Sequence, residues 1–402
     1  MRVVYVPNQP PETYSKSLFL AGPSPRDASH PNWRPAALRL LERLGYDGVV
    51  FVPLTEDGGW YGDKEQQYAW EKKYLDAADQ IVFWVPRDME KLPGLTTNVE
   101  FGMYYDSGRM VLGYPRSATH MHYLHSHAHK QQAPVHCTLF AALDSAVREI
   151  GDGAERIGGA RDVPLNIWRA PHFQSWYRAQ VAAGNRLDGA RPLWTCRVGP
   201  TKSFLFAYAL HVDVHVASEG RNKVNEFILS RPDVSTIVAY HTGADWFEWS
   251  ERTFRELLDM EVVIVREFRS PASVGDCMVR EVPGGSSWKP GEDPFDVAAH
   301  ELSEETGLTI EPRRLRLIGT RQIGATLSAH RAHVFSVSLR DDELRALKAI
   351  AASGQAHGVE ADSERTYVEV RKVSELLLQP LTDWANLGMI FRAVVNCGAD
   401  YP

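Results

Sequence analysis

Residues 284–308 read Gly-Gly-Ser-Ser-Trp-Lys-Pro-Gly-Glu-Asp-Pro-Phe-Asp-Val-Ala-Ala-His-Glu-Leu-Ser-Glu-Glu-Thr-Gly-Leu. The second half of this stretch predicts a helix that stops at Gly307. Residues three and four apart are neighbours on a helix, so Glu301, Glu304 and Glu305 point the same way while Leu302 faces the opposite side. Carboxylate oxygens suit Mg²⁺ or Mn²⁺. The stretch therefore predicts a divalent-metal site for diphosphate chemistry.

The same stretch resembles the Nudix hydrolases, whose pattern is Gly, five residues, Glu, seven residues, then Arg-Glu-apolar-x-Glu-Glu-x-Gly-apolar. The sequence departs from this pattern at two places. His300 stands where the family has arginine, and six residues rather than five separate Gly285 from Glu292. Loss of the arginine removes a bidentate hold on a neighbouring carboxylate, which predicts a weakened or substrate-shifted enzyme. The matching positions are Glu292, Glu301, Leu302, Glu304, Glu305, Gly307 and Leu308.

The flanking residues extend this resemblance. Residues 261–269 and 280–285 look like the strand pair that precedes the helix in Nudix enzymes acting on ADP-ribose and nucleoside-diphosphate sugars. An exposed acidic helix is the alternative for the carboxylates taken alone. The resemblance implies an α/β/α sandwich that uses Mg²⁺ or Mn²⁺. Its implied site comprises Gly285, Glu301, Glu304 and Glu305 at the metal, Arg269 and Glu281 at the substrate, and Glu364 as a general base.

A second signature lies near the start of the chain, where residues 17–26 run an apolar strand into the turn Ala-Gly-Pro-Ser-Pro-Arg. Backbone N–H groups and the positive end of the helix expected from about residue 32 favour a phosphate or a sugar oxygen at such a turn. Ser24 and Arg26 add side-chain donors. The turn predicts a cradle for a small anionic ligand.

Further short apolar runs follow at residues 45–53 and 79–86, and then the segment 93–102, Pro-Gly-Leu-Thr-Thr-Asn-Val-Glu-Phe-Gly. Continuous apolar runs bounded by turn residues are typical of buried parallel strands with helices between them. The order resembles the nucleoside 2-deoxyribosyltransferase-like proteins, including their nucleotide N-glycosidase branch, over roughly the first third of the chain. This resemblance implies a flavodoxin-like, doubly wound α/β domain.

The resemblance also assigns residues. Glu100 of the Glu-x-Gly motif is the implied nucleophile, since a carboxylate beneath the sugar can form a covalent glycosyl intermediate. Asp79 matches a second catalytic aspartate, and Gly22, Ser24, Arg26 and Asn98 are the implied substrate contacts. Gly94 replaces a further family aspartate, so transfer chemistry and deoxyribose preference do not follow. An ordinary helix-start glutamate is the alternative for Glu100.

Composition agrees with a chain of two or more domains. The 402 residues are 44% hydrophobic and 24% charged, with a net charge of −7, which favours a small phosphorylated ligand over nucleic acid. The four cysteines form no Cys-x-x-Cys pair, and no apolar run has the length of a membrane span. We therefore expect a cytoplasmic protein with no membrane or nucleic-acid partner. The deoxyribosyltransferase resemblance implies a homo-oligomer.

The glycine-rich and charged segment 151–164 predicts a linker. It separates a deoxyribosyltransferase-like domain over 1–155 from a Nudix domain over 165–402, whose strands near 203–219 and 234–240 we interpret as an N-terminal extension. We expect an inserted helix at 245–258 and a closing helix at 383–396. The histidine-rich segment 119–129 predicts an exposed loop or lid anchored by Tyr123 and Leu124, with a transition-metal site as the alternative.

Together these features predict a bifunctional nucleotide-processing hydrolase that cleaves an N-glycosidic bond and a phosphoanhydride. In one order, the Nudix site trims a nucleoside di- or triphosphate before the base is released. In the other, the N-terminal site removes a base from a dinucleotide such as NAD, and the Nudix site splits the resulting ADP-ribose. The alternative is an N-glycosidase or deoxyribosyltransferase regulated by a Nudix fold that binds a nucleotide without turnover.

Overall fold

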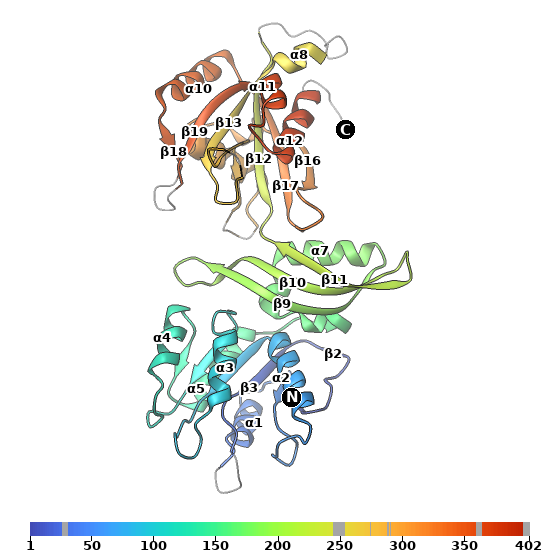
Figure 1. Cartoon of the computed structure of the whole chain (residues 1–402), viewed down its shortest axis with the longest axis vertical. Helices are drawn as coiled ribbons and strands as arrows, with labels where there is room; N and C mark the ends of the chain where they lie inside the picture. The colour runs from blue at the N-terminus through green and yellow to red at the C-terminus, as the bar shows by residue number, and fades with distance from the viewer. Residues whose placement is uncertain are drawn as a thin grey trace. The chain divides into compact units, whose positions relative to one another are not determined.

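The structure is a computed structural model of the whole chain, and it describes residues 1–25, 31–243, 254–273, 275–287, 289, 291–358 and 364–396. The chain divides into two compact units, Met1–Arg231 and Pro232–Pro402 (Figure 1). The division lies well after the linker predicted at 151–164. Residues 165–231, predicted to belong to the C-terminal domain, lie in the first unit.

The first unit is built on a six-stranded parallel sheet in the order β1-β4-β3-β5-β6-β7. Its last five strands follow the order 2-1-3-4-5 of flavodoxin-like folds, with the strand order reversing between β3 and β5, as predicted. The strands are β1 (Arg2–Tyr5), β3 (Ser17–Ala21), β4 (Val49–Val52), β5 (Gln80–Trp84), β6 (Met110–Gly113) and β7 (Val135–His136).

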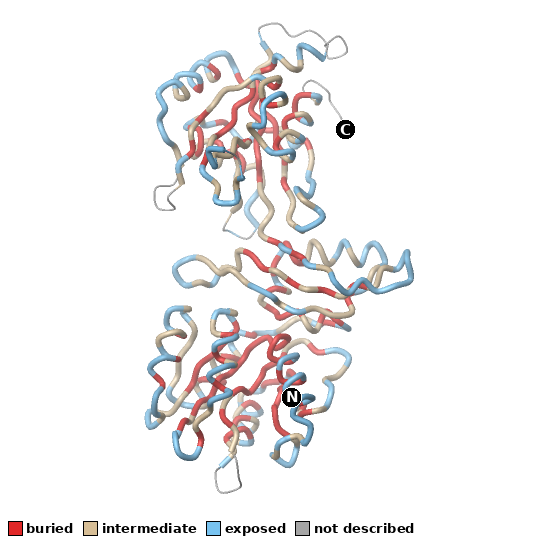
Figure 2. The backbone as a smooth tube through the Cα atoms, viewed as in Figure 1, coloured by how far each residue is buried: buried red, intermediate tan, exposed pale blue. Residues whose placement is uncertain are grey.

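Helices cover both faces of this sheet because alternate strand residues face opposite sides. Phe19 and Phe83 pack with α2, α3 and α4, whereas Leu18 and Val82 pack with α1 and α5. Figure 2 shows the strands of this sheet as buried and the helices around it as only partly exposed. The helices are α1 (Arg34–Arg43), α2 (Lys64–Ala77), α3 (Leu95–Tyr104), α4 (His122–Lys130) and α5 (Leu139–Ile150).

An antiparallel three-stranded sheet completes the first unit, in the order β11-β10-β9. The predicted linker is ordered instead as β8 (Arg156–Ile157), which pairs with β2 (Thr13–Tyr14), and a 3-10 turn, η1 (Gly158–Asp162). The added elements are α6 (Leu165–Trp168), α7 (Pro171–Ala182), β9 (Arg186–Val198), β10 (Phe204–Val216) and β11 (Arg221–Ser230).

The second unit is a mixed sheet in the order β16-β17-β12-β13-β19-β18, in which β12 and β17 are parallel and β14 and β15 pair alongside. The expected extension strand at 234–240 is β12, a central strand of this sheet. The strands are β12 (Val234–His241), β13 (Glu261–Phe268), β14 (Met278–Glu281), β15 (Gly284–Gly285), β16 (Arg316–Gln322), β17 (Arg331–Ser338), β18 (Ala356–His357) and β19 (Thr366–Lys372).

Helices cover both faces of the second sheet. Residues of α9 and α10 pack with Ile237 and Val263 on one face, and residues of α11 and α12 pack with Val238 and Val262 on the other. The predicted closing helix is α12. Of the helix expected at 245–258, residues 254–258 lie in α8 and the others lie outside the described residues. The helices are α8 (Phe254–Asp259), α9 (Pro294–Thr306), η3 (Pro312–Arg314), α10 (Asp341–Ser353), α11 (Val373–Leu378) and α12 (Trp384–Val395).

No helix in the described parts of the chain has the length and apolar character to cross a membrane.

Candidate functional site

The N-terminal candidate site lies at the carboxyl ends of β3 and β5, where the strand order reverses. Open α/β sheets bind ligands at such points. Gly22 follows β3 with φ of +141°, and a Cβ at this position would overlap the Trp84 carbonyl oxygen of β5. The predicted glycine turn is therefore required by the close passage of two neighbouring strand ends.

A buried arginine, Arg34 at the start of α1, holds this turn in place. Its Nε donates to the Leu20 carbonyl (3.2 Å), its Nη2 to the Gly22 carbonyl (2.8 Å) and its Nη1 to the Ser24 hydroxyl (2.9 Å). Burial lowers the pKa of Arg34 to about 10, which leaves the guanidinium charged at neutral pH. Arg34 thus brings a fixed positive charge to the turn that contains Gly22 and Ser24.

The predicted nucleophile, Glu100, lies on α3. Burial and the nearby charge of Glu71 raise the pKa of Glu100 to about 8, against the opposing influence of Arg34. Glu71 comes from α2, where its carboxylate accepts a hydrogen bond from Gln67 Nε2 (2.8 Å), and burial raises its pKa as well. Two carboxyl groups from different helices and one guanidinium therefore interact at this site.

Sequence reasoning missed Arg34 and Glu71. Arg34 sits in Asn-Trp-Arg-Pro, which reads as an ordinary helix start, and Glu71 sits on a helix whose charged residues are mostly solvated. A signal was nevertheless present for Glu71. It follows Trp70, a large apolar residue that is buried against Phe19 and Phe51, so this part of α2 packs against the sheet.

Asn98 lies on the exposed face of α3, two residues before Glu100. Its side-chain oxygen accepts a hydrogen bond from Arg87, which follows β5, and Arg87 Nη1 also donates to the His120 carbonyl (3.0 Å). Arg87 therefore connects β5, α3 and the histidine-rich segment. Arg26, another predicted substrate contact, lies outside the described residues.

Asp79 is not brought together with Glu100. It precedes β5, so it lies at the amino end of a strand whose carboxyl end borders the candidate site, roughly 17 Å away at ~3.3 Å per residue. Asp79 as a whole residue is 4% exposed, and its carboxylate accepts hydrogen bonds from Ser17 N (2.7 Å), Leu165 N (2.9 Å) and both Arg156 Nη atoms (2.7 and 2.6 Å). These hydrogen bonds join β3, β8 and α6 to the amino end of β5.

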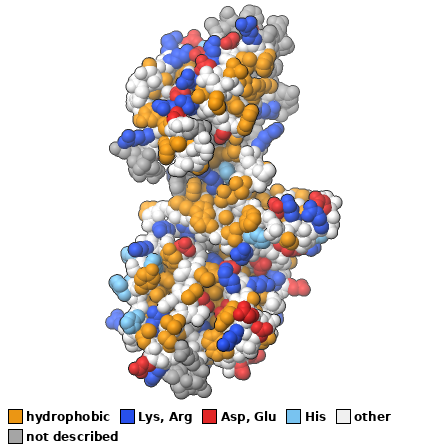
Figure 3. Space-filling model, viewed as in Figure 1, with side chains coloured by type: hydrophobic (Ala, Val, Ile, Leu, Met, Phe, Trp, Pro, Cys, Tyr) orange, Lys and Arg blue, Asp and Glu red, His pale blue; other side chains and the backbone are white. Residues whose placement is uncertain are grey.

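The histidine-rich segment forms α4 rather than a loop. Leu124 is buried and anchors the helix as predicted, whereas Tyr123 is 72% exposed. The exposed histidines include His122, His125 and His129, and Figure 3 shows histidine side chains on the surface of this part of the chain. Among the described residues, these histidines do not form a group with metal-ligand spacing.

The C-terminal candidate site is built around α9. Asp293 caps the helix by accepting from Phe295 N (2.9 Å), and Gly307 ends it with φ of +73°. Leu302 is buried in the core, as predicted for the face opposite the carboxylates. Local sequence therefore fixes both ends of the helix and the direction in which its acidic side chains point.

Two glycines allow the acidic side chains of α9 to approach the sheet. Gly284 N donates to Glu305 Oε2 (3.0 Å), and a Cβ on Gly285 would overlap the Glu301 carboxylate. Burial and the charge of Glu301 raise the pKa of Glu305 well above its ordinary value. The Gly-Gly pair is thus a packing surface for two carboxylates.

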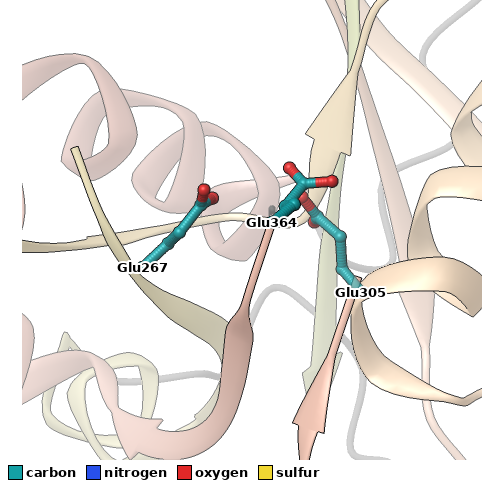
Figure 4. A group of neighbouring side chains, drawn as sticks. All are labelled: Glu267, Glu305 and Glu364. Atoms are coloured by element: carbon teal, nitrogen blue, oxygen red, sulfur yellow. The ribbon is translucent and has the colours of Figure 1, made fainter. Parts of the chain in front are cut away.

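Three carboxylates converge here: Glu305 from α9, Glu267 from β13 and Glu364 just before β19 (Figure 4). One oxygen of each lies within 4.8 Å of the others. Burial raises the pKa of Glu267 to about 7, with Glu364 adding to the effect and Arg269 opposing it. Clustered oxygen ligands without nitrogen or sulfur fit a hard divalent cation such as Mg²⁺ or Mn²⁺.

Only some of the residues predicted for the C-terminal site lie in or next to this three-carboxylate group. Glu305 and Glu364 belong to it, and Arg269 joins it through Glu267 (2.9 Å) while also holding Glu281 (2.7 Å). Glu304 is not part of the group. Its Oε2 atom lies 3.4 Å from Nδ1 of His300, the residue in the arginine position of the pattern. The structure adds Glu267, which alternation along β13 with the inward Val263 could have indicated.

A comparison with family models matches residues 15–118 to the family described as nucleoside 2-deoxyribosyltransferase like. No curated protein matches the chain. The matched region runs from just before β3 to just after β6, so it contains Gly22, Arg34, Glu71 and Glu100. The predicted Nudix resemblance of the second unit stays a prediction. Residues 15–118 form a nucleoside 2-deoxyribosyltransferase-like domain, which indicates processing of nucleoside N-glycosidic bonds.

Proposed function

We propose that the N-terminal unit cleaves the N-glycosidic bond of a nucleoside or nucleotide, with Glu100 as the nucleophile. The observation that carries this proposal is the position of Glu100, at the carboxyl edge of the sheet in a deoxyribosyltransferase-like domain, beside buried Arg34 and Glu71. A carboxylate at a ligand-binding edge can attack an anomeric carbon.

In the proposed reaction, an oxygen of ionised Glu100 forms an ester bond to the anomeric carbon as the bond from that carbon to the base nitrogen breaks. The bond electrons leave with the base, which takes up a proton. Water then attacks the anomeric carbon and gives up a proton as the bond from that carbon to the Glu100 oxygen breaks, which releases the free sugar or sugar phosphate and regenerates the Glu100 carboxylate. Arg34 supports these steps by favouring the ionised form of Glu100.

A product screen by mass spectrometry tests this function. The full chain is incubated with nucleosides, nucleoside mono-, di- and triphosphates and NAD, and each free base is measured. We expect base release by the wild type and its loss in Glu100→Gln. Glu65→Gln, a change at an exposed glutamate of α2, serves as the control and should keep full activity. Equal base release by wild type and Glu100→Gln would exclude Glu100 as the nucleophile.

For the second unit, we propose divalent-metal-dependent hydrolysis of a phosphoanhydride, as in Nudix enzymes. The convergence of Glu267, Glu305 and Glu364 supports this second function. These residues would hold Mg²⁺ or Mn²⁺, which when bound supplies Lewis-acid polarisation of a phosphoryl oxygen. Arg269, held between Glu267 and Glu281, would contact the anionic substrate.

The two proposed reactions fit either order of steps: anhydride cleavage before base release, or removal of a base from NAD followed by cleavage of ADP-ribose. Adding ADP-ribose and NAD to the same screen, with and without Mg²⁺, separates the two orders. We expect Glu305→Gln to abolish anhydride cleavage without affecting base release from nucleosides and nucleoside monophosphates, which contain no anhydride. Nucleotide binding without anhydride cleavage in the wild type would instead support a regulatory second unit.

A further inference from the structure

The first unit contains a second cavity, of about 450 Å³, at the opposite edge of its parallel sheet from Glu100. Its walls come from residues that precede β5, β6 and β7, from the end of α5, from α6, and from the turn between β9 and β10. We call it the amino-edge cavity. Pockets of this size are typical for small organic ligands.

Basic side chains dominate the charge of the amino-edge cavity. Arg109, Arg169, Arg197 and Lys202 line it, against the carboxylates of Asp106 and Glu149. Asp79 also lines it but is neutralised by its ion pair with Arg156. In a chain whose net charge is −7, this local excess of cations favours an anionic ligand.

The four cations make no ion pair with a carboxylate in the described ranges. Arg169 donates to the Ile150 carbonyl (2.6 Å), and Lys202 donates to the side-chain oxygen of Gln131 (2.9 Å). Arg197 donates to the Gly108 carbonyl (2.8 Å), which fixes the β9–β10 turn over the start of β6. Glu149 partly offsets the charge of Arg197, whereas Arg169 and Lys202 are held by neutral partners, so their positive charge remains available to a ligand.

Part of the remaining wall is apolar. Met110, Ile150 and Leu165 are buried residues that line the cavity, and the Tyr105 side chain lines it from the end of α3. An inorganic anion alone would leave this surface unfilled, whereas a phosphorylated molecule with a flat organic part matches both walls. Arginine and lysine are the side chains that most often bind phosphate.

We infer that the amino-edge cavity binds a phosphorylated small molecule of mononucleotide size, at a site separate from the one that contains Glu100. Its phosphate contacts Arg169, the most exposed of the four cations, and Lys202, and its organic part packs against Met110 and Leu165. This site is independent of the proposed base-release reaction, since it uses none of the residues assigned to that reaction.

The test measures binding to the full chain by isothermal titration calorimetry, in a Glu100→Gln background that prevents turnover. AMP, inorganic phosphate and adenosine are the probes. We expect AMP to bind most tightly, and Lys202→Ala or Arg169→Ala to weaken the affected AMP site about tenfold each. Lys202→Arg should restore most of the affinity. Arg148→Ala, a change at an exposed arginine of α5 next to Glu149, should leave the isotherm unchanged.

Hydrogen exchange locates the ligand independently of activity. We expect AMP to protect backbone amides in residues 105–110, 131–134 and 197–203, and the Lys202→Ala change to remove that protection. The inference is wrong if AMP protects only residues around Glu100, or if AMP affinity is the same in Lys202→Ala, Arg169→Ala and Arg148→Ala. Those results would leave the proposed base-release reaction unaffected, since it is judged by its products.

Discussion

Glu100 is a carboxyl group with the titration behaviour of a much weaker acid, because burial and Glu71 raise its pKa to about 8. Only the ionised form can attack an anomeric carbon. We therefore expect kcat/KM for base release to increase from pH 6 to pH 9, with a midpoint near the pKa of about 8. Glu100→Gln should lower the rate roughly 10³-fold or more at every pH. A rate that is flat over this range would contradict the assignment.

The raised pKa of Glu100 also affects the free energy of unfolding of the first unit. The ordinary pKa of the Glu100 carboxyl is 4.5, so between pH 4.5 and 8 the folded chain binds more protons than the unfolded chain. Stability from this group is present below pH 4.5 and is lost as the pH rises through 8. Glu100→Gln removes this loss, and we expect it to raise the unfolding free energy of the first unit at pH 8 by about 1–3 kcal/mol relative to the wild type, measured by urea denaturation.

Glu71 supplies a direct check on the cause of this shift. Its negative charge raises the pKa of Glu100, so Glu71→Gln should move the rising limb of the rate profile to lower pH. Glu65→Gln, on an exposed position of the same helix, should leave the midpoint in place. A lower rate with an unshifted midpoint would assign Glu71 to packing alone.

At the scale of an element, the amino edge of β5 is fastened by Asp79 and Arg156, which are 1% and 0% exposed in their side chains. Asp79→Asn leaves Arg156 buried without its counter-charge and should destabilise the first unit by about 3–5 kcal/mol. Since Asp79 lies at the opposite edge from Glu100, kcat per folded molecule should change little. Denaturation and active-site-normalised kinetics separate the two effects, and a large loss of kcat in fully folded protein would restore the catalytic role that the sequence predicted.

The contact between α9 and β15 depends on the absence of a side chain. Gly285→Ala places a methyl group against the Glu301 carboxylate, so we expect a loss of about 1–3 kcal/mol in stability and weaker Mg²⁺ binding by the second unit. Gly324→Ala, where a Cβ meets open space, is the matched control. Equal Mg²⁺ affinity in both variants would show that the carboxylate position does not matter for the metal.

Sequence periodicity predicted where the strands lie along the chain better than it predicted which strands pair with one another. Continuous apolar runs placed β3, β4 and β5 correctly, because a buried parallel strand leaves a strong local signal. The same reasoning misplaced β10, since alternation along 204–216 indicates a strand but not the sheet it joins. The convergence of Glu267 with Glu364, and of Glu71 with Glu100, depends on such long-range pairing and could not be read locally.

At the scale of the whole molecule, the division falls between Arg231 and Pro232. A fragment of residues 1–231 should fold cooperatively and retain base release, because it keeps Arg156 and Leu165 as donors to Asp79. A fragment of residues 1–155, the domain predicted from sequence, lacks both donors. We expect it to lose cooperative unfolding in thermal denaturation. A sharp transition in this shorter fragment would instead support a domain boundary at the predicted linker, residues 151–164.

The direction of the parallel strands has a kinetic consequence. Glu100 lies at one edge of the sheet and the amino-edge cavity at the other, with the length of β5 between them. A compound held in that cavity leaves the catalytic edge open to substrate, so excess substrate would not displace it. Its inhibition pattern would be noncompetitive or mixed, and an inhibitor of this kind would keep its potency at saturating nucleotide concentrations.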